Sequence, residues 1–362
     1  MDEFIIQQVA LTLIPGLGPK RTREILNLFE NPMEVFRAPL RDFKSLGFFS
    51  SGFYHSLHSK DLMMDSEKIV EACSNKKINI TFFTDPLYPA RLSHCDDAPV
   101  VLYSTGRALQ SYPYSISIVG TRNPSAYGID FVNQFIEAIP QFPITVVSGL
   151  AYGVDLAVHK ACLTHQIPTI GCVAHGLHTI YPAAHKNIAA QMSEKGGVIS
   201  EYPPGVFADK ERFPMRNRII AGLSDSILIV ESAESGGSLI TAQFAQQYNR
   251  DIYALPGRFA DEKSVGCNHL IKKNIAEIIT DIPSLLKDLG LAGQQRLAFE
   301  TSTLSENANK IHQLLQQYRS MHIDEITFKS SLANSDLFEA LFELEINGRI
   351  HKLPGSRVAF AH

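Results

Sequence analysis

Six short runs in the middle of the chain are apolar at almost every position: residues 115–120, 144–149, 168–174, 196–202, 226–232 and 251–257. A strand that is buried on both faces of a sheet has this pattern, because its side chains alternate between two covered faces. The roughly 20–30 residues between successive runs suffice for a crossover helix. The pattern predicts an α/β domain over residues 76–285, with a doubly wound parallel sheet and right-handed crossovers.

The N-terminal section, residues 1–75, repeats its apolar residues at helical spacing. Residues 14–26, IPGLGPKRTREIL, are typical of a helix-hairpin-helix in a helical, SAM-like domain. Gly16 and Gly18 allow a tight turn whose amides can face a DNA phosphate. Residues 43–57 resemble a degenerate second copy. A helical packing module that does not contact DNA is the alternative interpretation.

The C-terminal section begins with a weakly patterned linker, residues 286–305, and continues with a small unit, residues 306–362. Helices followed by a hairpin over 349–361, with its turn at 354–356, predict a winged helix. Its candidate recognition helix, 335–347, has no Lys or Arg but four acidic residues: Asp336, Glu339, Glu343 and Glu345. DNA phosphates would repel such a helix, so we expect this unit to contact protein rather than DNA.

Composition limits the classes of function. The chain has 33 basic and 37 acidic residues, a net charge of −4, which excludes a histone-like binder but allows a local basic groove. No apolar run reaches the ~18 residues of a membrane span, and the acidic start lacks the positive region of a signal peptide. Five cysteines without a CxxC pair indicate buried, reduced thiols. We expect a cytoplasmic protein without membrane insertion.

Several turns at the ends of the predicted strands suit a phosphate group. Gly120, Thr121 and Arg122 follow the first strand; they do not form GxGxxG, which argues against a nicotinamide or flavin site. A glycine, a hydroxyl and a guanidinium still suit an anion. Arg122 as an ordinary loop arginine is the alternative.

The second turn contains Ser148 and Gly149, and Asp155 and His159 follow at helical spacing. A Ser-His-Asp triad would need the GxSxG elbow, which is absent. We therefore interpret the segment as an anion-binding turn with a structural Asp–His pair. The histidines of residues 172–186 do not have the spacing of a zinc site, so we expect no metal.

Two more segments complete the set. Arg216, Asn217 and Arg218 begin a predicted helix, where guanidiniums suit a phosphate backbone, although pairing with Glu201, Glu211 or Asp225 is an alternative. Gly237 and Ser238 lie in a glycine-rich turn before another helix, which suits an oxyanion but is not a P-loop. Turns of this kind at one sheet edge, with Lys186 as a further cation, predict a phosphate-lined groove for a nucleotide polymer.

These motifs together resemble the DprA/Smf family of DNA-processing proteins. The resemblance covers about residues 80–280 and rests on IVGTRNPSAYG, VVSGLAYGVDLAVHKA, IYPAAHK, GVISEYPPG, FPMRNRIIAGLSDSILIVESAESGGSLITAQFA, YALPGR and GCNHLI, in that order. It implies an extended Rossmann-like fold that binds single-stranded DNA, without enzymatic activity or a cofactor. It also implies loading of RecA onto incoming strands in natural transformation, and action against single-strand-binding protein.

The resemblance also implies positions for the DNA pocket and for a homodimer contact. The pocket carries over to Gly120, Thr121, Arg122, Lys186 and Arg216–Arg218. The dimer contact matches residues 268–279, where apolar side chains are Leu270, Ile271, Ile275 and Ile278.

The chain departs from the family pattern at two places. Asn274-Ile275 stand where Gly-Ala is common; asparagine tolerates positive φ, so the turn can survive. His175 and His178 replace a more usual small-residue loop.

An enzyme on a related fold is the alternative function. The segment 236–243 resembles the loop of lysine-decarboxylase-like phosphoribohydrolases, which cleave nucleoside monophosphates. Gln243 stands where that loop has its catalytic glutamate, and an amide cannot serve as the acid or base. A nuclease would need clustered acidic metal ligands, and Glu201 and Glu231 lack such neighbours. Both comparisons favour binding over catalysis.

Overall fold

The computed structural model describes residues 3–29, 31–43, 46–47, 51–139, 142–291, 305–318, 320–330, 332–346, 350–353 and 357–360. The chain divides into two compact units, Met1–Ala292 and Gly293–His362. Each unit is described by itself.

The first unit is built on a nine-stranded sheet with the order β1-β2-β6-β5-β4-β3-β7-β8-β9. Its strands are β1 Asn79–Phe82, β2 Val101–Gly106, β3 Tyr114–Val119, β4 Ile144–Ser148, β5 Thr169–Cys172, β6 Gly197–Ser200, β7 Ser226–Ile229, β8 Asp251–Ala254 and β9 Glu277–Ile278. All six strands predicted from the apolar runs are present as β3 to β8, and they are parallel. After β6 the chain returns to the other side of β3, so the topological switch point lies between β3 and β7.

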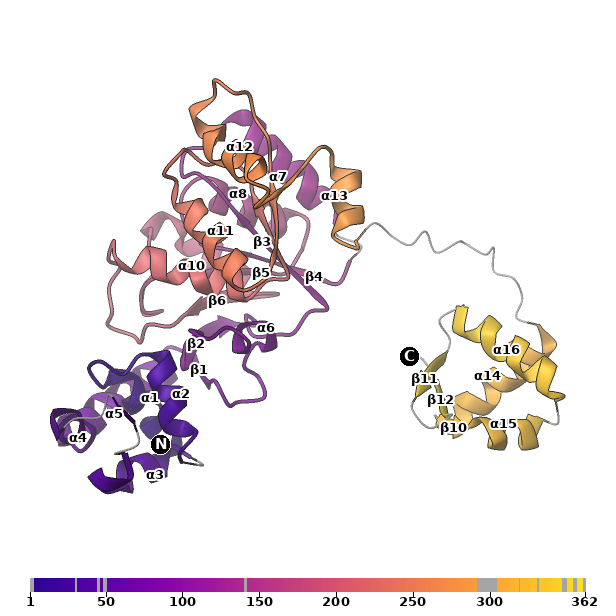
Figure 1. The fold of residues 1–362 in the computed structure, drawn as a ribbon, viewed down its shortest axis with the longest axis horizontal. Coiled ribbons are helices and arrows are strands. Elements are labelled where there is room, and N and C mark those ends of the chain that lie inside the picture. Colours follow the sequence, from indigo (N-terminus) through magenta and orange to yellow (C-terminus); the bar gives the residue numbers. More distant parts are fainter. Residues whose placement is uncertain are drawn as a thin grey trace. The chain divides into compact units, whose positions relative to one another are not determined.

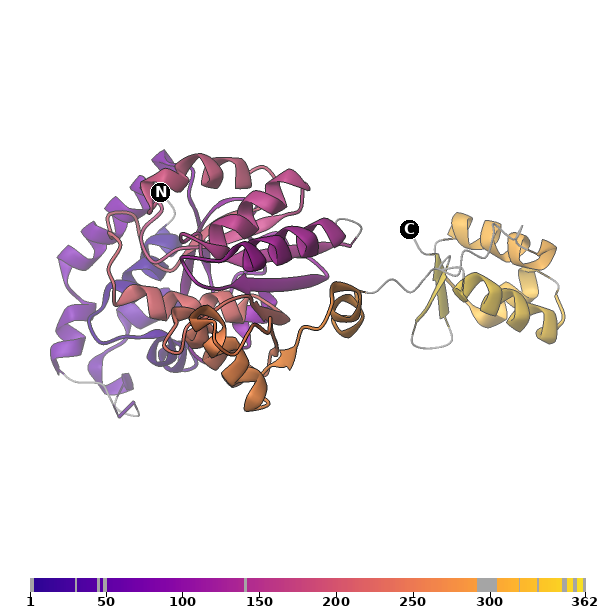
Figure 2. The same ribbon diagram turned by 90° about the horizontal axis from the view of Figure 1, so that it is seen from above.

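Helices cover both faces of this sheet (Figures 1 and 2). One face carries α7 Ala126–Ala138, α8 Val154–Thr164 and α13 Ile282–Asp288, and the other carries α6 Ala90–Ser93, α10 Arg212–Gly222, α11 Gly237–Gln247 and α12 Val265–Lys272. The remaining pieces of this part are α9 Lys186–Met192, η2 Ala183–His185 and η3 Glu262–Ser264. Leu285, Leu289 and Leu291 belong to the core under α7, so the first residues of the expected linker are part of this unit.

The N-terminal helices pack on the sheet edge formed by β1 and β2. They are α1 Glu3–Leu13, α2 Pro19–Leu26, α3 Pro32–Arg37, η1 Leu40–Phe43, α4 Ser51–Leu57 and α5 Lys60–Asn75. The turn between α1 and α2 has Gly16 at φ +78°, with Leu17 N–H donating to the Ile14 carbonyl at 3.1 Å. This is the tight turn that the glycines predicted. The proposed second copy, residues 43–57, falls partly outside the described residues.

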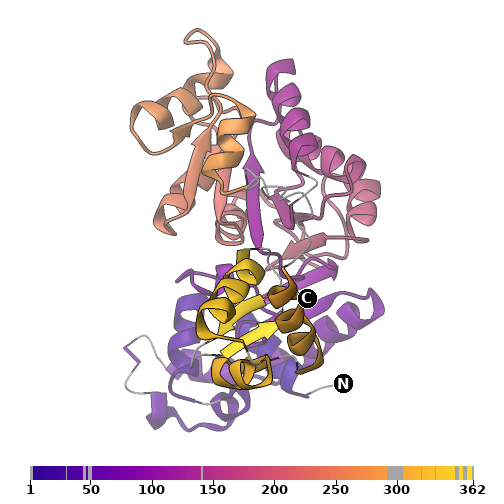
Figure 3. The same cartoon turned by 90° about the vertical axis from the view of Figure 1, so that its right-hand side faces the viewer.

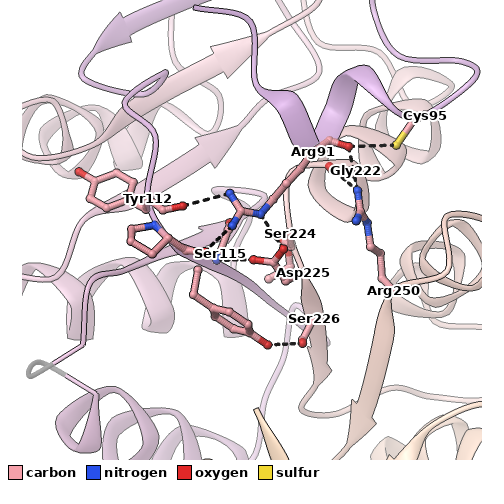
Figure 4. A network of polar contacts seen from close by, with 12 residues as sticks. Arg91, Cys95, Tyr112, Ser115, Gly222, Ser224, Asp225, Ser226 and Arg250 are labelled. Atoms are coloured by element: carbon pink, nitrogen blue, oxygen red, sulfur yellow. Dashed lines mark hydrogen bonds and ion pairs between the residues drawn. The ribbon is translucent and has the colours of Figure 1, made fainter. Parts of the chain in front are cut away.

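A polar network attaches the β1–β2 extension to the parallel sheet (Figure 4). Arg91 of α6 pairs with Asp225 at 2.7 Å and donates to the Tyr112 and Pro113 carbonyls. Asp225 also accepts from Ser115 N–H at 2.8 Å. One guanidinium and one carboxylate therefore tie the extension to β3 and to the start of β7.

The second unit combines three helices with a three-stranded antiparallel sheet of order β10-β12-β11 (Figure 3). The elements are α14 Glu306–Tyr318, β10 Ser320–His322, α15 Ile323–Ser330, α16 Asn334–Ile346, β11 Ile350–Leu353 and β12 Arg357–Phe360. The winged-helix prediction is thereby confirmed, although the expected turn at 354–356 lies outside the described residues. Its core contains Ile311, Leu315, Leu337 and Leu344.

Candidate functional site

A cleft of about 530 Å³ opens at the carboxyl ends of β3 and β7, and we call it the central cleft. It lies at the topological switch point, which is where open α/β sheets bind their ligands. Its walls contain four charged residues: Arg122, Asp155, Lys210 and Arg216. Three cations against one carboxylate favour an anion over a cation as the ligand of the central cleft.

Arg216 forms the floor of the central cleft and is only 4% exposed. Its guanidinium donates to the carbonyls of Gly149 and Cys172, at the ends of β4 and β5. Burial lowers the pKa of Arg216 and raises the pKa of Asp155, while the attraction between the two charges opposes both shifts. A Cβ at Gly149 would lie 2.7 Å from the Arg216 guanidinium, which explains the glycine.

Aromatic rings surround the cations at the mouth of the cleft. Arg122 lies over the Phe213 ring at 5.4 Å, and Arg216 approaches the same ring at 5.9 Å. Tyr181 is half-exposed, with its ring centroid 6.2 Å from that of Phe213. Tyr152 lines a small recess that shares these residues with the central cleft. Rings beside guanidiniums can hold a base and a phosphate together.

Sequence reasoning missed Phe213, Tyr181 and Lys210, although a signal for two of them was present. Residues 210–216 read KERFPMR, in which an aromatic residue lies between basic ones. Such interleaving is typical of segments that bind nucleic acid. Tyr181 has no comparable signal, because only the fold brings it to Phe213.

The amino end of α11 contributes a second kind of anion ligand. Ser238 lines the cleft, is 7% exposed, and its hydroxyl has no hydrogen-bond partner among the described residues. Asn217 donates to the Gly237 carbonyl at 3.1 Å and thereby joins α10 to this turn. Amides at a helix start and an unpartnered hydroxyl suit an oxyanion.

The turn after β3 offers side chains rather than backbone amides to a ligand in the central cleft. Thr121 N–H donates to the Glu231 carbonyl at 2.8 Å, and its hydroxyl accepts from Asn123 N–H at 3.3 Å. A Cβ at Gly120 would overlap the Val154 side chain, so this glycine serves close packing of β3 against α8. Arg122 has no carboxylate partner in the described part of the chain and is exposed.

Comparison with known proteins identifies the family. Residues 79–290 match the family described as DNA recombination-mediator protein A, and residues 296–356 match the DprA winged helix domain. The chain belongs to the DprA/Smf family.

Relatives of known sequence and structure agree with this assignment. Protein Smf of Synechocystis is 30% identical over 96% of this chain and 97% of its own length. The X-ray structure of DprA from Streptococcus pneumoniae has a TM-score of 0.63 at 30% identity, covering 80% of this chain and 98% of that one. DprA of Helicobacter pylori, solved in a study of its single-stranded DNA binding mode, has a TM-score of 0.53 at 26% identity, covering 59% and 95%.

Four residues carried over from the DprA/Smf resemblance or its motifs do not line the central cleft, and one of them, Gly149, lines the small recess beside it. Arg218 is 3% exposed, pairs with Glu201 and donates to the Asp97 carbonyl, so the structure supports the ion-pair alternative. Ser148 is fully buried and donates to the Ile118 carbonyl at 2.7 Å. Lys186 is exposed at the start of α9, outside the residues that line the cleft.

The expected Asp–His pair is also not formed. The His159 ring contacts the Thr169 hydroxyl at 2.7 Å, whereas Asp155 accepts from Ala151 N–H at 3.3 Å. The two side chains have different partners, because His159 reaches the first residue of β5 whereas Asp155 reaches the loop after β4. The described residues contain no group of three or more metal-ligating side chains. Among these residues, no helix is long and apolar enough to cross a membrane.

The family's dimer segment is divided between core and surface. Leu270 is buried in the core, and Ile271 and Ile275 pack against the same core. Ile278 is 46% exposed on β9, the last strand of the sheet. Asn274 has φ +53°, so asparagine does adopt the turn where the family commonly has glycine.

Proposed function

We propose that this protein binds single-stranded DNA in the central cleft. The observation that carries the proposal is the pair Arg122 and Arg216 beside the Phe213 ring, with Lys210 lining the same cleft at the switch point of the sheet. Cations supply affinity for phosphates by releasing counterions. Half-exposed Tyr152 and Tyr181 offer surfaces for unpaired bases, which a duplex keeps stacked. The study of the Helicobacter pylori relative supports the same ligand.

The role we propose for this binding is that of a recombination mediator in the processing of incoming DNA during natural transformation. The protein would load RecA onto the bound strand and act against single-strand-binding protein. Family membership supports the mediator role. Its partners then are single-stranded DNA, RecA and a second copy of the chain.

We propose binding without catalysis. Gln243 lies on the exposed side of α11 and is not among the residues that line the central cleft. An amide there cannot act as the general acid or base of a hydrolysis. The competing function, hydrolysis of a nucleoside monophosphate, predicts release of base from nucleotide. Chromatography of nucleotide incubated with the protein distinguishes the two, since a mediator releases none.

The central test is Arg122→Ala. We expect weaker binding of single-stranded DNA by about 1–3 kcal/mol, the usual contribution of a charge-assisted hydrogen bond to phosphate. The measurement is a fluorescence titration with a labelled oligonucleotide, single-stranded and duplex, at several salt concentrations.

The matched control is Arg107→Ala. Arg107 is exposed directly after β2, which pairs antiparallel with β6 and so ends at the opposite edge of the sheet. We expect its loss to leave affinity nearly unchanged. Equal affinity of folded Arg122→Ala and the unmodified protein would refute the cleft as the DNA site.

A further inference from the structure

A loop beside the central cleft holds an aromatic ring out into solvent. Phe207, in the loop between β6 and α10, is 70% exposed. Its backbone is nonetheless fixed: Gly176 N–H donates to the Val206 carbonyl at 2.8 Å, and the Arg212 guanidinium donates to the Phe207 carbonyl at 2.6 Å. The backbone of the loop is therefore held by hydrogen bonds on both sides of the exposed ring.

The ring itself is also oriented. The centroids of Phe207 and His178 lie 5.2 Å apart at 81°, an edge-to-face contact. The His178 ring is in turn fixed, because its Nδ1 accepts from Gly205 N–H at 3.0 Å. The contact with His178 fixes the orientation of the Phe207 ring and leaves the rest of the ring surface open to a ligand. Pre-orientation lowers the entropy cost of stacking a ligand on it.

The loop adjoins both the central cleft and the small recess beside it. His175, which precedes the Gly176 contact, lines the recess with Tyr181 and Phe213. Lys210, three residues after Phe207, lines the central cleft. Phe207 is therefore on the same loop as a cation of the central cleft, where a strand that leaves the cleft over this loop can reach it.

We propose that Phe207 stacks a base of the bound strand just outside the central cleft, so that the footprint on single-stranded DNA is longer than the cleft alone. The ligand is an unpaired nucleobase, which a phenyl ring accepts regardless of sequence. This inference rests on the proposed function and adds the direction in which the strand leaves the cleft.

A second exposed phenylalanine lies beside a different cleft, whose charges suit a phosphate backbone less well. Phe259, in the loop after β8, is 97% exposed beside a second cleft of about 780 Å³. That cleft has three carboxylates against two cations: Glu231, Asp261 and Glu262 against Arg258 and Lys263. A phosphate backbone would be repelled there. Phe259 thus provides a matched control: the same residue type, with greater exposure, beside a cleft whose lining has more carboxylates than cations.

The experiment compares Phe207→Ala, Phe207→Tyr and Phe259→Ala in the full chain. Oligothymidylates of increasing length are titrated against each variant. For the shortest oligomers that bind at all, we expect Phe207→Ala to have the same affinity as the unmodified protein. For longer oligomers, we expect its affinity to be lower by roughly five-fold or more. Phe207→Tyr restores the length dependence, because a tyrosine ring stacks as well. Phe259→Ala leaves it unchanged.

A direct contact is measured by photocrosslinking with 5-iodouracil placed at successive positions of a long oligonucleotide, followed by mass spectrometry of peptides. We expect one position to crosslink to Phe207. The proposal is overturned if Phe207→Ala keeps the full length dependence, or if the crosslink and the length effect map to Phe259. If the unmodified protein binds no oligomer, the proposed function itself fails; if Arg122→Ala weakens binding and Phe207→Ala does not, only this inference fails.

Discussion

At the scale of single residues, buried polar side chains determine which groups the central cleft presents. Two carbonyls at strand ends accept hydrogen bonds from Arg216. They fix its side chain, so that its charge stays at the floor of the cleft. Arg218 lies only two positions further along α10. Residues two apart on a helix do not share a face, so Arg218 turns to Glu201 instead. The motif Arg-Asn-Arg thus contains one site residue and one structural residue, which spacing alone could not separate.

His159 leads to a prediction about pH. It is fully buried, and burial lowers its pKa to about 3. The unfolded chain binds a proton at this residue below about pH 6.5 and the folded chain does not, so its contribution to stability is present above pH 6.5 and is lost as the pH falls. At pH 5 the loss amounts to about 2 kcal/mol in the free energy of unfolding.

The measurement is urea unfolding at pH 7 and pH 5, for the unmodified protein and for His159→Gln. Burial raises the pKa of Asp155 and of Glu201, which act in the opposite direction, so the comparison between the two proteins isolates the histidine. We expect the variant to lose less stability than the unmodified protein between the two pH values. An equal loss in both would show that His159 does not cause the acid sensitivity.

At the scale of elements, the sequence predicted the strands that follow a repeating pattern and missed those that do not. The strands β3 to β8 are apolar runs with a helix between them, so one pattern found them all. The extension β1–β2 is antiparallel, has no crossover helix of the repeating kind, and is attached by the pairing of Arg91 with Asp225. These two residues are 134 positions apart, so their ion pair cannot be predicted from the local pattern of apolar residues. The same holds for Tyr181 and Phe213, which come from separate segments.

The edge strand β9 leads to a prediction about oligomeric state. We propose that the dimer contact uses Ile278, which is exposed on β9, together with the accessible parts of Ile271 and Ile275. An edge strand with an apolar side chain is a ready surface for a second copy. We expect Ile278→Glu to yield monomers, because a charge in an apolar contact is costly.

Light scattering at micromolar concentration measures this outcome. Leu87→Glu is the control, since Leu87 is also exposed but lies outside the proposed contact. We expect it to remain dimeric. A folded Ile278→Glu protein that is still a dimer would place the interface elsewhere.

At the scale of the whole molecule, the two units differ in the surface they offer. The first unit has a cationic cleft with aromatic rings. Residues 306–362 carry six basic and seven acidic residues, and α16 exposes Asp336 and Glu339 beside Phe338 and Phe342. Affinity for a phosphate backbone depends on cations, and α16 has none. That this helix contacts protein rather than DNA stays a prediction, and the motive for it is the two exposed rings that its own core does not use.

The last prediction follows from this difference. Removal of residues 300–362 should leave most of the affinity for single-stranded DNA, because the cations proposed to hold phosphate all lie in Met1–Ala292. The test is a titration of the truncated and full-length proteins with the same oligonucleotide at several salt concentrations, with circular dichroism and light scattering to show that the truncated protein is folded and has kept its oligomeric state. We expect equal salt slopes, since the number of phosphates neutralised is unchanged. A loss of about ten-fold or more, equivalent to ~1.4 kcal/mol, together with a shallower slope, would show that the winged helix contacts DNA.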